Sequence, residues 1–274
     1  LLPGVIHVPY PYPYRCPFRV EPEECGDAVI AYIEEWVLGK LVDPEEVSSI
    51  IIEPIQGESG YVVPPDGFLE SLERLARKHG MLFVADEVQT GFGRTGRWFA
   101  VEHWGVEPDL VATAKAIASG LPLGALIGRS DVMDLPPGSH ATTFGGNPVA
   151  LAACRATIRV LREEGLVERA YRLGEEALKF LRDLAVEASL IGDVRGKGLM
   201  IGVELVEDHD TKRPAVEAAR RVLMESFKRG VLVIGGGVST IRMAPPLNIS
   251  EELLWRGLEI LADILRDASK RYQR

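Results

Sequence analysis

The sequence predicts an α/β fold, with a mostly parallel sheet flanked by helices and a smaller α+β domain after it. Short apolar runs alternate with helical patterns over residues 49–164, which is typical of parallel βαβ units. Beyond this segment, strands and helices follow one another in a mixed order. We therefore expect a large domain over residues 1–166 and a small C-terminal domain over residues 167–274.

Each element of the large domain has its own signal. Prolines and tyrosines at residues 7–19 predict an extended surface arm, because proline fixes φ and restricts the residue before it. Helical spacing predicts a helix at residues 23–41, with Trp36 on its buried face. Two further helices are expected at residues 67–78 and 147–164, capped by Asp66 and Asn147. Apolar runs predict buried strands at residues 49–53, 81–85, 110–113 and 125–128.

The small domain is predicted from longer helical patterns. We expect helices at residues 168–187, 214–229 and 250–270, and strands at residues 199–206 and 231–234. Residues 191–198 contain three glycines and are interpreted as the approach to the first of these strands. Gly235–Gly237 is interpreted as a turn.

Composition limits the possible partners and location. The 274 residues carry 31 Lys and Arg against 40 Asp and Glu, a net charge of −9, which disfavours nucleic acid and anionic membranes as partners. No apolar run reaches the roughly 20 residues of a membrane span. The start, Leu1-Leu2-Pro3-Gly4, has neither an initiator Met nor the pattern of a signal peptide, so we interpret the chain as a fragment.

Cysteine and amide usage suggest where the protein works. Cys16, Cys25 and Cys154 are odd in number and lack metal spacing, which favours reduced thiols and a cytoplasmic protein. The five histidines show no metal spacing either, and we expect no metal. Asn and Gln are scarce and Arg exceeds Lys 23 to 8, which favours a thermophile.

Two charged residues follow predicted strands of the same sheet. Asp86 comes directly after the apolar run 81–85, and Lys115 lies among small residues just after the run 110–113. Parallel sheets bind ligands at this edge. Asp86 alone could simply cap a turn, and Lys115 alone could extend its amine into water. If both are buried, the amine has a lowered pKa and can form a Schiff base, and the pair suits pyridoxal phosphate.

The sequence resembles a known family in five stretches that occur in the expected order. They are Glu53–Gly60, Asp86–Gly96, Ala114–Lys115 with Gly120–Gly124, Thr142–Pro148, and Ile241–Leu247. By these stretches the chain is identified as a member of the class-III, ω-amino-acid-type aminotransferases of pyridoxal-phosphate fold type I. The string Asp-Glu-Val-Gln-Thr-Gly-Phe-Gly-Arg-Thr-Gly is the most specific of them.

The resemblance implies a role for each cofactor residue. Lys115 resembles the Schiff-base lysine, and Asp86 the partner of the pyridinium nitrogen. Val88 is similar to the residue that packs on the ring, and Gln89 to the one near the phenolic oxygen. Thr143 resembles the threonine that binds the cofactor phosphate of the neighbouring subunit, although it could also be an ordinary strand threonine.

The resemblance also implies a substrate gate. Arg242 is similar to the arginine that grips a substrate carboxylate in a bidentate fork. Glu58 is similar to the glutamate that neutralises this arginine when the substrate lacks a carboxylate there. The alternatives are a structural ion pair for Arg242 and a solvated loop acid for Glu58.

These roles imply an aminotransferase that moves an ω-amino group, as from 4-aminobutyrate, to 2-oxoglutarate by a ping-pong mechanism. Acetylornithine or ornithine aminotransferase, an amino-acid racemase of the same family and an inactive fragment remain alternatives. The partners implied are an amino-acid donor, a 2-oxo acid acceptor and a second copy in a homodimer with shared active sites. Family chains are longer at the N-terminus, and that part would supply the phosphate-binding helix start and the aromatic residue stacked on the ring.

Overall fold

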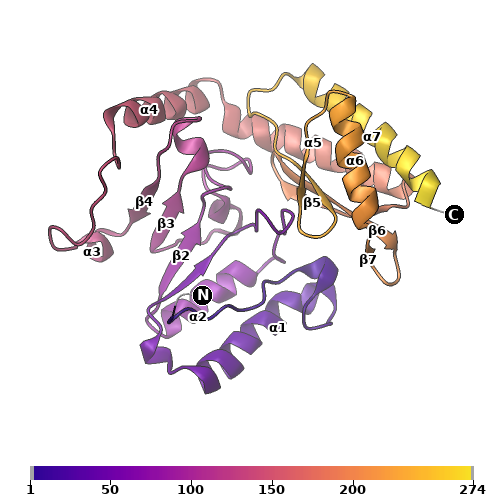
Figure 1. Cartoon of the computed structure of the whole chain (residues 1–274). Helices are drawn as coiled ribbons and strands as arrows, with labels where there is room; N and C mark the ends of the chain where they lie inside the picture. Colours follow the sequence, from indigo (N-terminus) through magenta and orange to yellow (C-terminus); the bar gives the residue numbers. More distant parts are fainter. Residues whose placement is uncertain (1–2, 273–274) are drawn as a thin grey trace.

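The computed structural model describes residues 3–272 and confirms the α/β class, with one sheet in each half of the chain (Figure 1). Leu1 and Leu2, on which the expected absence of a leader partly rests, lie outside the described residues. Residues 3–272 include no helix that is both long and apolar enough to cross a membrane. The same residues hold no group of three or more acidic, histidine or cysteine side chains suited to a metal ion.

The first sheet has four strands in the order β1 (Ser49–Ile52), β2 (Leu82–Asp86), β3 (Leu110–Thr113) and β4 (Ala125–Gly128). β1 pairs with β2, and β2 with β3, in parallel, whereas β4 runs antiparallel to β3. The prediction of a parallel βαβ unit is therefore wrong for β4. A parallel return needs a crossover of a dozen or more residues, and the segment joining β3 to β4 holds only the short helix η6 (Lys115–Ala118).

Helices α1 (Cys25–Ala31) and α2 (Phe68–Lys78) pack beside this sheet (Figure 1). Phe68, Leu69 and Leu72 meet Phe83 of β2 in a common buried cluster. Beyond α1 the chain continues as the π-helix η3 (Tyr32–Leu41), whose wider turn rotates side chains away from α-helical positions. Trp36 is consequently 53% exposed, so its predicted burial is wrong.

The other helices of this half of the chain differ in length, from three to 16 residues. They are η1 (Pro13–Arg15), η2 (Pro22–Glu24), η4 (Pro44–Glu46), η5 (Ala100–Trp104), α3 (Ser130–Met133) and α4 (Pro148–Glu163). The Asn147 side chain caps α4 as predicted, accepting from Ala150 N at 2.9 Å. Asp66 does not cap α2, because the N-cap position is taken by Gly67 at φ 82°.

The second sheet has the strand order β5 (Ile191–Lys197), β6 (Met200–Asp208), β9 (Thr240–Met243) and β8 (Ile234–Gly236). The short strand β7 (Arg213–Pro214) also pairs with β6, and all of these pairings are antiparallel. Helices α5 (Leu166–Glu187), α6 (Val216–Lys228) and α7 (Glu251–Tyr272) pack with it around one apolar core. Residues 191–197 form a full strand rather than an approach, and Gly235 and Gly236 lie in β8 rather than in a turn. α5 begins at the expected boundary, and the division at residue 166 stays a prediction.

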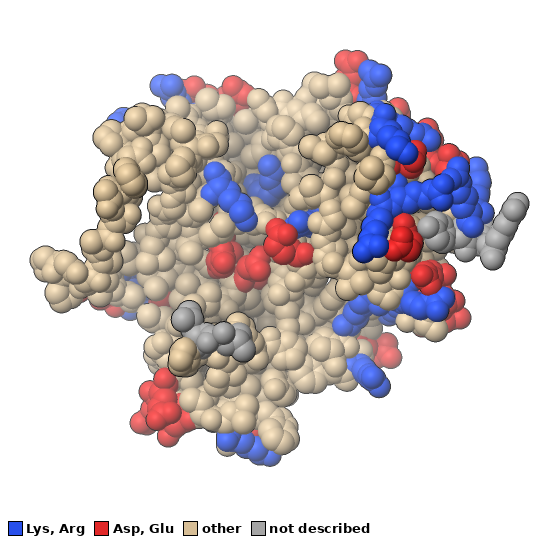
Figure 2. Space-filling view, viewed as in Figure 1, with Lys and Arg blue, Asp and Glu red and all other residues tan. Residues whose placement is uncertain are grey.

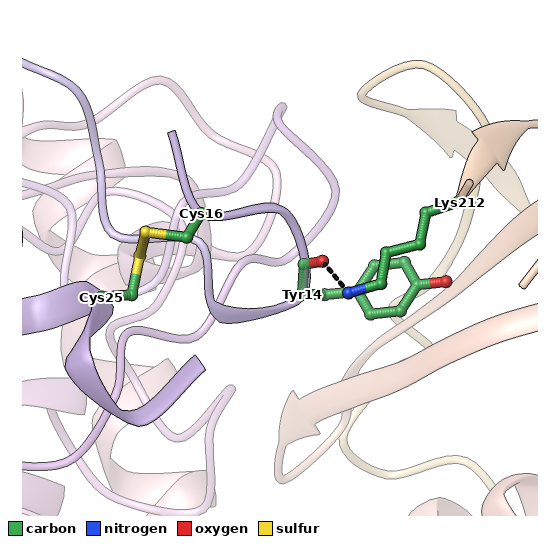
Figure 3. The surroundings of a disulfide bond; sticks show 4 residues. All are labelled: Tyr14, Cys16, Cys25 and Lys212. Carbon is green, nitrogen blue, oxygen red and sulfur yellow. Dashed lines mark hydrogen bonds between the residues drawn. A yellow bond between two sulfur atoms is a disulfide. The ribbon is translucent and has the colours of Figure 1, made fainter. Parts of the chain in front are cut away.

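The N-terminal arm lies half-buried along the surface and turns back on the start of α1. This turn brings Cys16 next to Cys25, with Cα atoms 5.7 Å apart, and the two form a disulfide (Figure 3). The prediction of three reduced thiols is therefore wrong, and only Cys154 is free. The cytoplasmic location loses this support and stays a prediction. From the same arm, the Tyr14 carbonyl accepts from Lys212 Nζ at 3.0 Å, which links the arm to the small domain.

Candidate active site

The carboxyl ends of β1, β2 and β3 meet at one edge of the first sheet. Glu53 follows β1, Asp86 ends β2, and Lys115 lies two residues after the end of β3. Since the three strands are parallel neighbours, the topology places these charged residues at one edge, as the sequence predicts for Asp86 and Lys115. Acidic side chains gather in the middle of this face of the molecule, with basic side chains beside them (Figure 2).

Asp86 is half-buried at the end of its strand. Its Oδ1 accepts from the backbone N–H of Val88 at 3.0 Å, so the carboxylate does cap the following turn. The turn-capping interpretation and the site interpretation of Asp86 are thus compatible, because the turn uses one oxygen of a carboxylate that stays at the sheet edge. Val88, on this turn, is half-buried as well.

Lys115 is exposed, which corrects the expectation of a buried amine. The residue opens η6 with a φ of 42°, and its neighbours Ala114 and Ala116 are too small to cover its side chain. Positive φ is strained for a residue with a side chain and is found preferentially at functional sites. The amine forms no hydrogen bond or ion pair with any residue from 3 to 272, and it therefore remains available for chemistry.

Glu53 lies close to Asp86 and Lys115, although it is not among the residues predicted for the site. Burial raises the pKa of the Glu53 carboxyl, and the nearby Asp86 carboxylate raises it further, whereas the Gly57 N–H, at 2.8 Å, and the Lys115 ammonium lower it. These effects show that Glu53, Asp86 and Lys115 share one electrostatic environment. Its position in the sequence could have indicated this, because Glu53 directly follows the apolar run of β1, just as Asp86 follows the apolar part of β2.

Gln89 connects the sheet edge to the loop after β1. Its Nε2 donates to Glu58 Oε1 at 3.3 Å, and its Oε1 is buried without a hydrogen-bond partner in the described structure. A Cβ atom at Gly57 would lie only 2.6 Å from that oxygen, so the glycine is required for the close approach. A buried polar atom without a partner indicates a place where a ligand or water completes the hydrogen bonding.

Glu58 and Arg242 form a bidentate ion pair across the two halves of the chain. Arg242 Nη1 and Nη2 lie 3.0 and 2.9 Å from the two carboxylate oxygens. The arginine side chain is 6% exposed, whereas that of Glu58 is 80% exposed. The Arg242 hydrogen bonds, followed by that of Gln89, hold the pKa of Glu58 below its usual value. The arginine is thus fixed and the glutamate is free to leave.

Arg242 is held independently of Glu58. Its Nε donates to Gly235 O and its Nη1 to Gly57 O, each at 2.9 Å, and the guanidinium lies over the Tyr61 ring at 5.2 Å. These contacts would keep the guanidinium in place with Glu58 turned away, as a carboxylate-binding fork requires.

Thr143 is the predicted site residue that the structure does not bring to this edge. It lies on the exposed segment between α3 and α4, which Figure 1 shows on the far side of the large domain from the small domain. Glu58, Asp86, Val88, Gln89, Lys115 and Arg242 lie at the carboxyl edge of the first sheet or in the loop and strand linked to it by hydrogen bonds. The role of Thr143 towards a neighbouring subunit stays a prediction.

The residues at this edge fit pyridoxal phosphate. A primary amine without a partner, a carboxylate on the adjacent strand and a buried amide oxygen in need of a donor match the groups that hold such a cofactor. A mostly parallel sheet with these residues at its carboxyl edge, joined to a small α+β half, is the arrangement expected of a pyridoxal-phosphate enzyme of fold type I.

Comparison with known proteins identifies the family within this class. The class-III aminotransferase family matches residues 1–265, and the chain belongs to this family. It is 44% identical, over 97% of its length, to the 4-aminobutyrate aminotransferase of Mycobacterium leprae. It is also 44% identical, over 98% of its length, to the leucine/methionine racemase of Thermococcus litoralis. Family membership makes pyridoxal 5'-phosphate the cofactor.

Solved structures agree with the family assignment. The (S)-enantioselective ω-transaminase of Thermomicrobium roseum superposes on the whole chain with a TM-score of 0.87 and 34% identity, and the match covers 62% of that transaminase. The chain likewise spans 60% of the Mycobacterium leprae enzyme and 61% of the Thermococcus litoralis enzyme. It therefore corresponds to about three fifths of the length of these relatives.

Proposed function

We propose that the protein transfers an ω-amino group, as from 4-aminobutyrate, to 2-oxoglutarate in a ping-pong cycle. The observation that carries the proposal is the Glu58–Arg242 pair, with its fixed arginine and exposed glutamate. Near this arginine, 2-oxoglutarate would present a carboxylate and 4-aminobutyrate would not. An enzyme that uses both substrates in turn needs an arginine whose charge is free for the first and neutralised for the second. Glu58 provides the cover, and its side chain has room to move.

Four further residues divide the chemistry. Bound pyridoxal phosphate supplies an electron sink for negative charge at the substrate carbon. The Asp86 carboxylate keeps a proton on the ring nitrogen, and the Lys115 amine carries the proton removed from and returned to the substrate carbon. Gln89 supplies hydrogen bonding near the phenolic oxygen, and Val88 supports the ring by packing. The exposed position of Lys115 at the rim and the unpaired oxygen of Gln89 support these assignments.

We further infer a homodimer in which Thr143 of one subunit binds the cofactor phosphate of the other. The exposure of the segment that carries Thr143 supports this arrangement, because a loop that serves a partner's site must extend away from its own.

The assay is glutamate formation from 2-oxoglutarate with 4-aminobutyrate, ornithine or N-acetylornithine as the donor, using the protein that contains this chain. Faster turnover with 4-aminobutyrate is the expected result. Glu58→Gln should weaken the half-reaction with 4-aminobutyrate more than the half-reaction with 2-oxoglutarate, since only the former needs the arginine neutralised. Equal losses in both half-reactions would contradict the gate.

A second candidate is amino-acid racemisation, which the similarity to the leucine/methionine racemase favours. The same lysine and cofactor would remove a proton from one face of the substrate carbon and return one to the other. Incubating single enantiomers of leucine, methionine or alanine without any oxo acid distinguishes the two functions. Decay of optical rotation with no amino transfer would establish the racemase and reject the aminotransferase.

A further inference from the structure

The loop that carries Glu58 is a tight hairpin of the large domain, residues 56–62, which we call the Glu58 hairpin. Gln56 and Val62 pair through backbone hydrogen bonds of 3.0 and 3.1 Å at its base. Towards the tip, the N–H groups of Gly60 and Tyr61 both approach Gly57 O, at 3.2 and 3.3 Å. The tip rests on the small domain, where Gly237 N donates to Glu58 O at 2.8 Å.

Two arginines of the small sheet hold the two sides of this tip. Arg195 of β5 and Arg242 of β9 are both in register with Gly202 of β6, so they flank it on one face of the sheet. Arg242 Nη1 donates to Gly57 O at 2.9 Å, and Arg195 Nε donates to Gly60 O at 3.0 Å. Glu58 lies between these two anchored carbonyls.

Gly202 makes room for the hairpin between the arginines. A Cβ atom at this position would lie 2.8 Å from Gly60 O, closer than ordinary packing allows. Any side chain on β6 at this point would push the Gly60 carbonyl away from Arg195.

Arg195 is itself fixed by a buried network. Its Nη1 lies 2.7 Å from Asp193 Oδ2 and 2.8 Å from Glu204 Oε2, and its Nη2 donates to Thr240 Oγ1 at 3.1 Å. Arg195 and Glu204 are 7% and 4% exposed. A buried ion pair of this kind adds little net stability, because desolvation offsets the attraction between the charges. Its effect here is to leave the guanidinium a single orientation, with Nε aimed at the hairpin.

We propose that Arg195 is a positioning residue for substrate selection: by holding the Gly60 carbonyl it fixes the Glu58 hairpin, so that only the Glu58 side chain moves when Arg242 is covered or uncovered. This proposal rests on the gate in the proposed function. It assigns Arg195 a role distinct from that of Arg242, since Arg195 contacts the hairpin backbone and not the Glu58 carboxylate. Without the hydrogen bond from Arg195 to Gly60, the whole hairpin would move. The ion pair between Glu58 and Arg242 would then be formed in a smaller fraction of the molecules.

The decisive variant is Arg195→Lys, which keeps a cation facing Glu204 and Asp193 but has no Nε–H for Gly60. Hydrogen exchange of the amides of Gly60, Tyr61 and Gly237 should become at least about tenfold faster, while amides of α5 keep their wild-type rates. Arg169→Lys is the matched control, because Arg169 also holds backbone carbonyls, those of Leu247 and Ile249, but outside the hairpin. It should leave exchange in the hairpin unchanged.

Glutarate, a dicarboxylate without an amino group, probes the gate directly in calorimetric titrations of the same proteins. Glu58→Gln should tighten glutarate binding, because the arginine is no longer covered, and Arg242→Met should abolish it. Arg195→Lys should tighten glutarate binding by about three- to tenfold, to an affinity between those of wild type and Glu58→Gln. The reason is that Glu58 would be turned away from Arg242 in a larger fraction of the molecules, and only those molecules bind glutarate. Gly202→Ala should shift both readouts in the same direction as Arg195→Lys.

The outcomes separate the two claims. If Glu58→Gln and Arg242→Met leave glutarate affinity unchanged, the gate is rejected, and the role of Arg195 with it. If both respond but Arg195→Lys matches the wild type in hairpin exchange and glutarate affinity, only the positioning role is overturned.

Discussion

Lys115 combines a backbone conformation with φ of 42° and an exposed side chain. The backbone strain costs stability, of the order of 1–3 kcal/mol, and persists only where the surroundings enforce it. Here the turn from β3 into η6 enforces it and directs the residue to the sheet edge that Asp86 and Glu53 share. The proposed function of Lys115 therefore depends on an unusual backbone as well as on the amine.

This assignment predicts that Lys115 is the residue modified when the chain is incubated with pyridoxal phosphate and then reduced with borohydride. Peptide mass spectrometry should locate the reduced cofactor on Lys115, and Lys115→Ala should lose that adduct while it unfolds at the wild-type temperature. Lys197, whose charge lies over the Trp104 ring, provides the control substitution. An adduct that persists in Lys115→Ala would show that another lysine holds the cofactor.

His103 predicts how stability depends on pH. Burial, then the charge of Lys197, lowers the pKa of His103 from 6.5 to about 4, although the Thr95 carbonyl at 3.0 Å acts in the opposite direction. Between these two pH values the unfolded chain binds the extra proton and the folded chain does not. Stability therefore falls as the pH drops from about 6.5 to about 4, and His103 has no such effect above pH 6.5.

This loss of stability is expected to be about 1–2 kcal/mol. Each pKa unit of the shift represents about 1.4 kcal/mol, and the partly exposed His103 ring realises only part of the total because solvent screens the charge. Urea unfolding at pH 7.0 and 4.5 measures the fall, and His103→Gln should reduce it by that amount. A variant with the same pH dependence as wild type would assign the acid sensitivity to other groups.

At the scale of elements, the N-terminal arm connects three parts of the molecule. The disulfide ties it to α1, Tyr12 and Arg15 reach Glu204, and the Tyr14 carbonyl accepts from Lys212 (Figure 3). Glu204 is the carboxylate that fixes Arg195, so the arm closes over the buried network beneath the Glu58 hairpin.

Removal of the disulfide should lower the free energy of unfolding by about 2–3 kcal/mol, the loop-closure entropy of a short loop. Cys16 and Cys25 are separated by nine positions, and Cys25 is fully buried. Cys16→Ser tests the effect by urea unfolding, with Cys154→Ser as the control for the loss of a free thiol. Equal stabilities for Cys16→Ser and wild type under oxidising conditions would show that the bond does not constrain the chain.

The sequence predicts elements well where one local pattern suffices. The apolar runs at residues 49–53 and 81–85 are confirmed as β1 and β2, and Asn147 begins α4. β5 was missed because its glycines interrupt the apolar pattern of a strand that pairs with β6 through a tight turn. The direction of β4 and the bond between Cys16 and Cys25 depend on contacts between separate segments, which local patterns do not encode.

The same limit applies to the site. Asp86 and Lys115 could be predicted because strand ends in a parallel sheet share one edge, and Glu58 and Arg242 because a family motif places them. Glu53 could have been selected from its position directly after β1, whereas Arg195 could not, because its significance lies in the groups that surround it. Burial of Lys115 was predicted wrongly, since small neighbours in the sequence indicate apolar surroundings but do not cover a long side chain.

At the scale of the whole molecule, the proposed homodimer concerns the surface around Thr143. Phe144 is 82% exposed and Val149 69% exposed, and Leu151 on the same helix is 45% exposed. In the proposed dimer, the partner would cover exposed apolar side chains such as Phe144 and Val149 beside Thr143. We propose that a two-fold dimer brings each Thr143 to the partner's Lys115.

The composite site predicts that two inactive variants restore each other. Lys115→Ala keeps Thr143, and Thr143→Val keeps Lys115, so a hybrid dimer contains one site with both residues and one with neither. After subunit exchange in an equal mixture, half the dimers are hybrids, and activity should reach about one quarter of wild type. The measurement is turnover of the protein that contains this chain, with exchange verified by native mass spectrometry of isotopically distinct subunits. A mixture that has exchanged and is no more active than either variant alone would show that each subunit builds its site by itself, because only a site shared between subunits gains from the exchange.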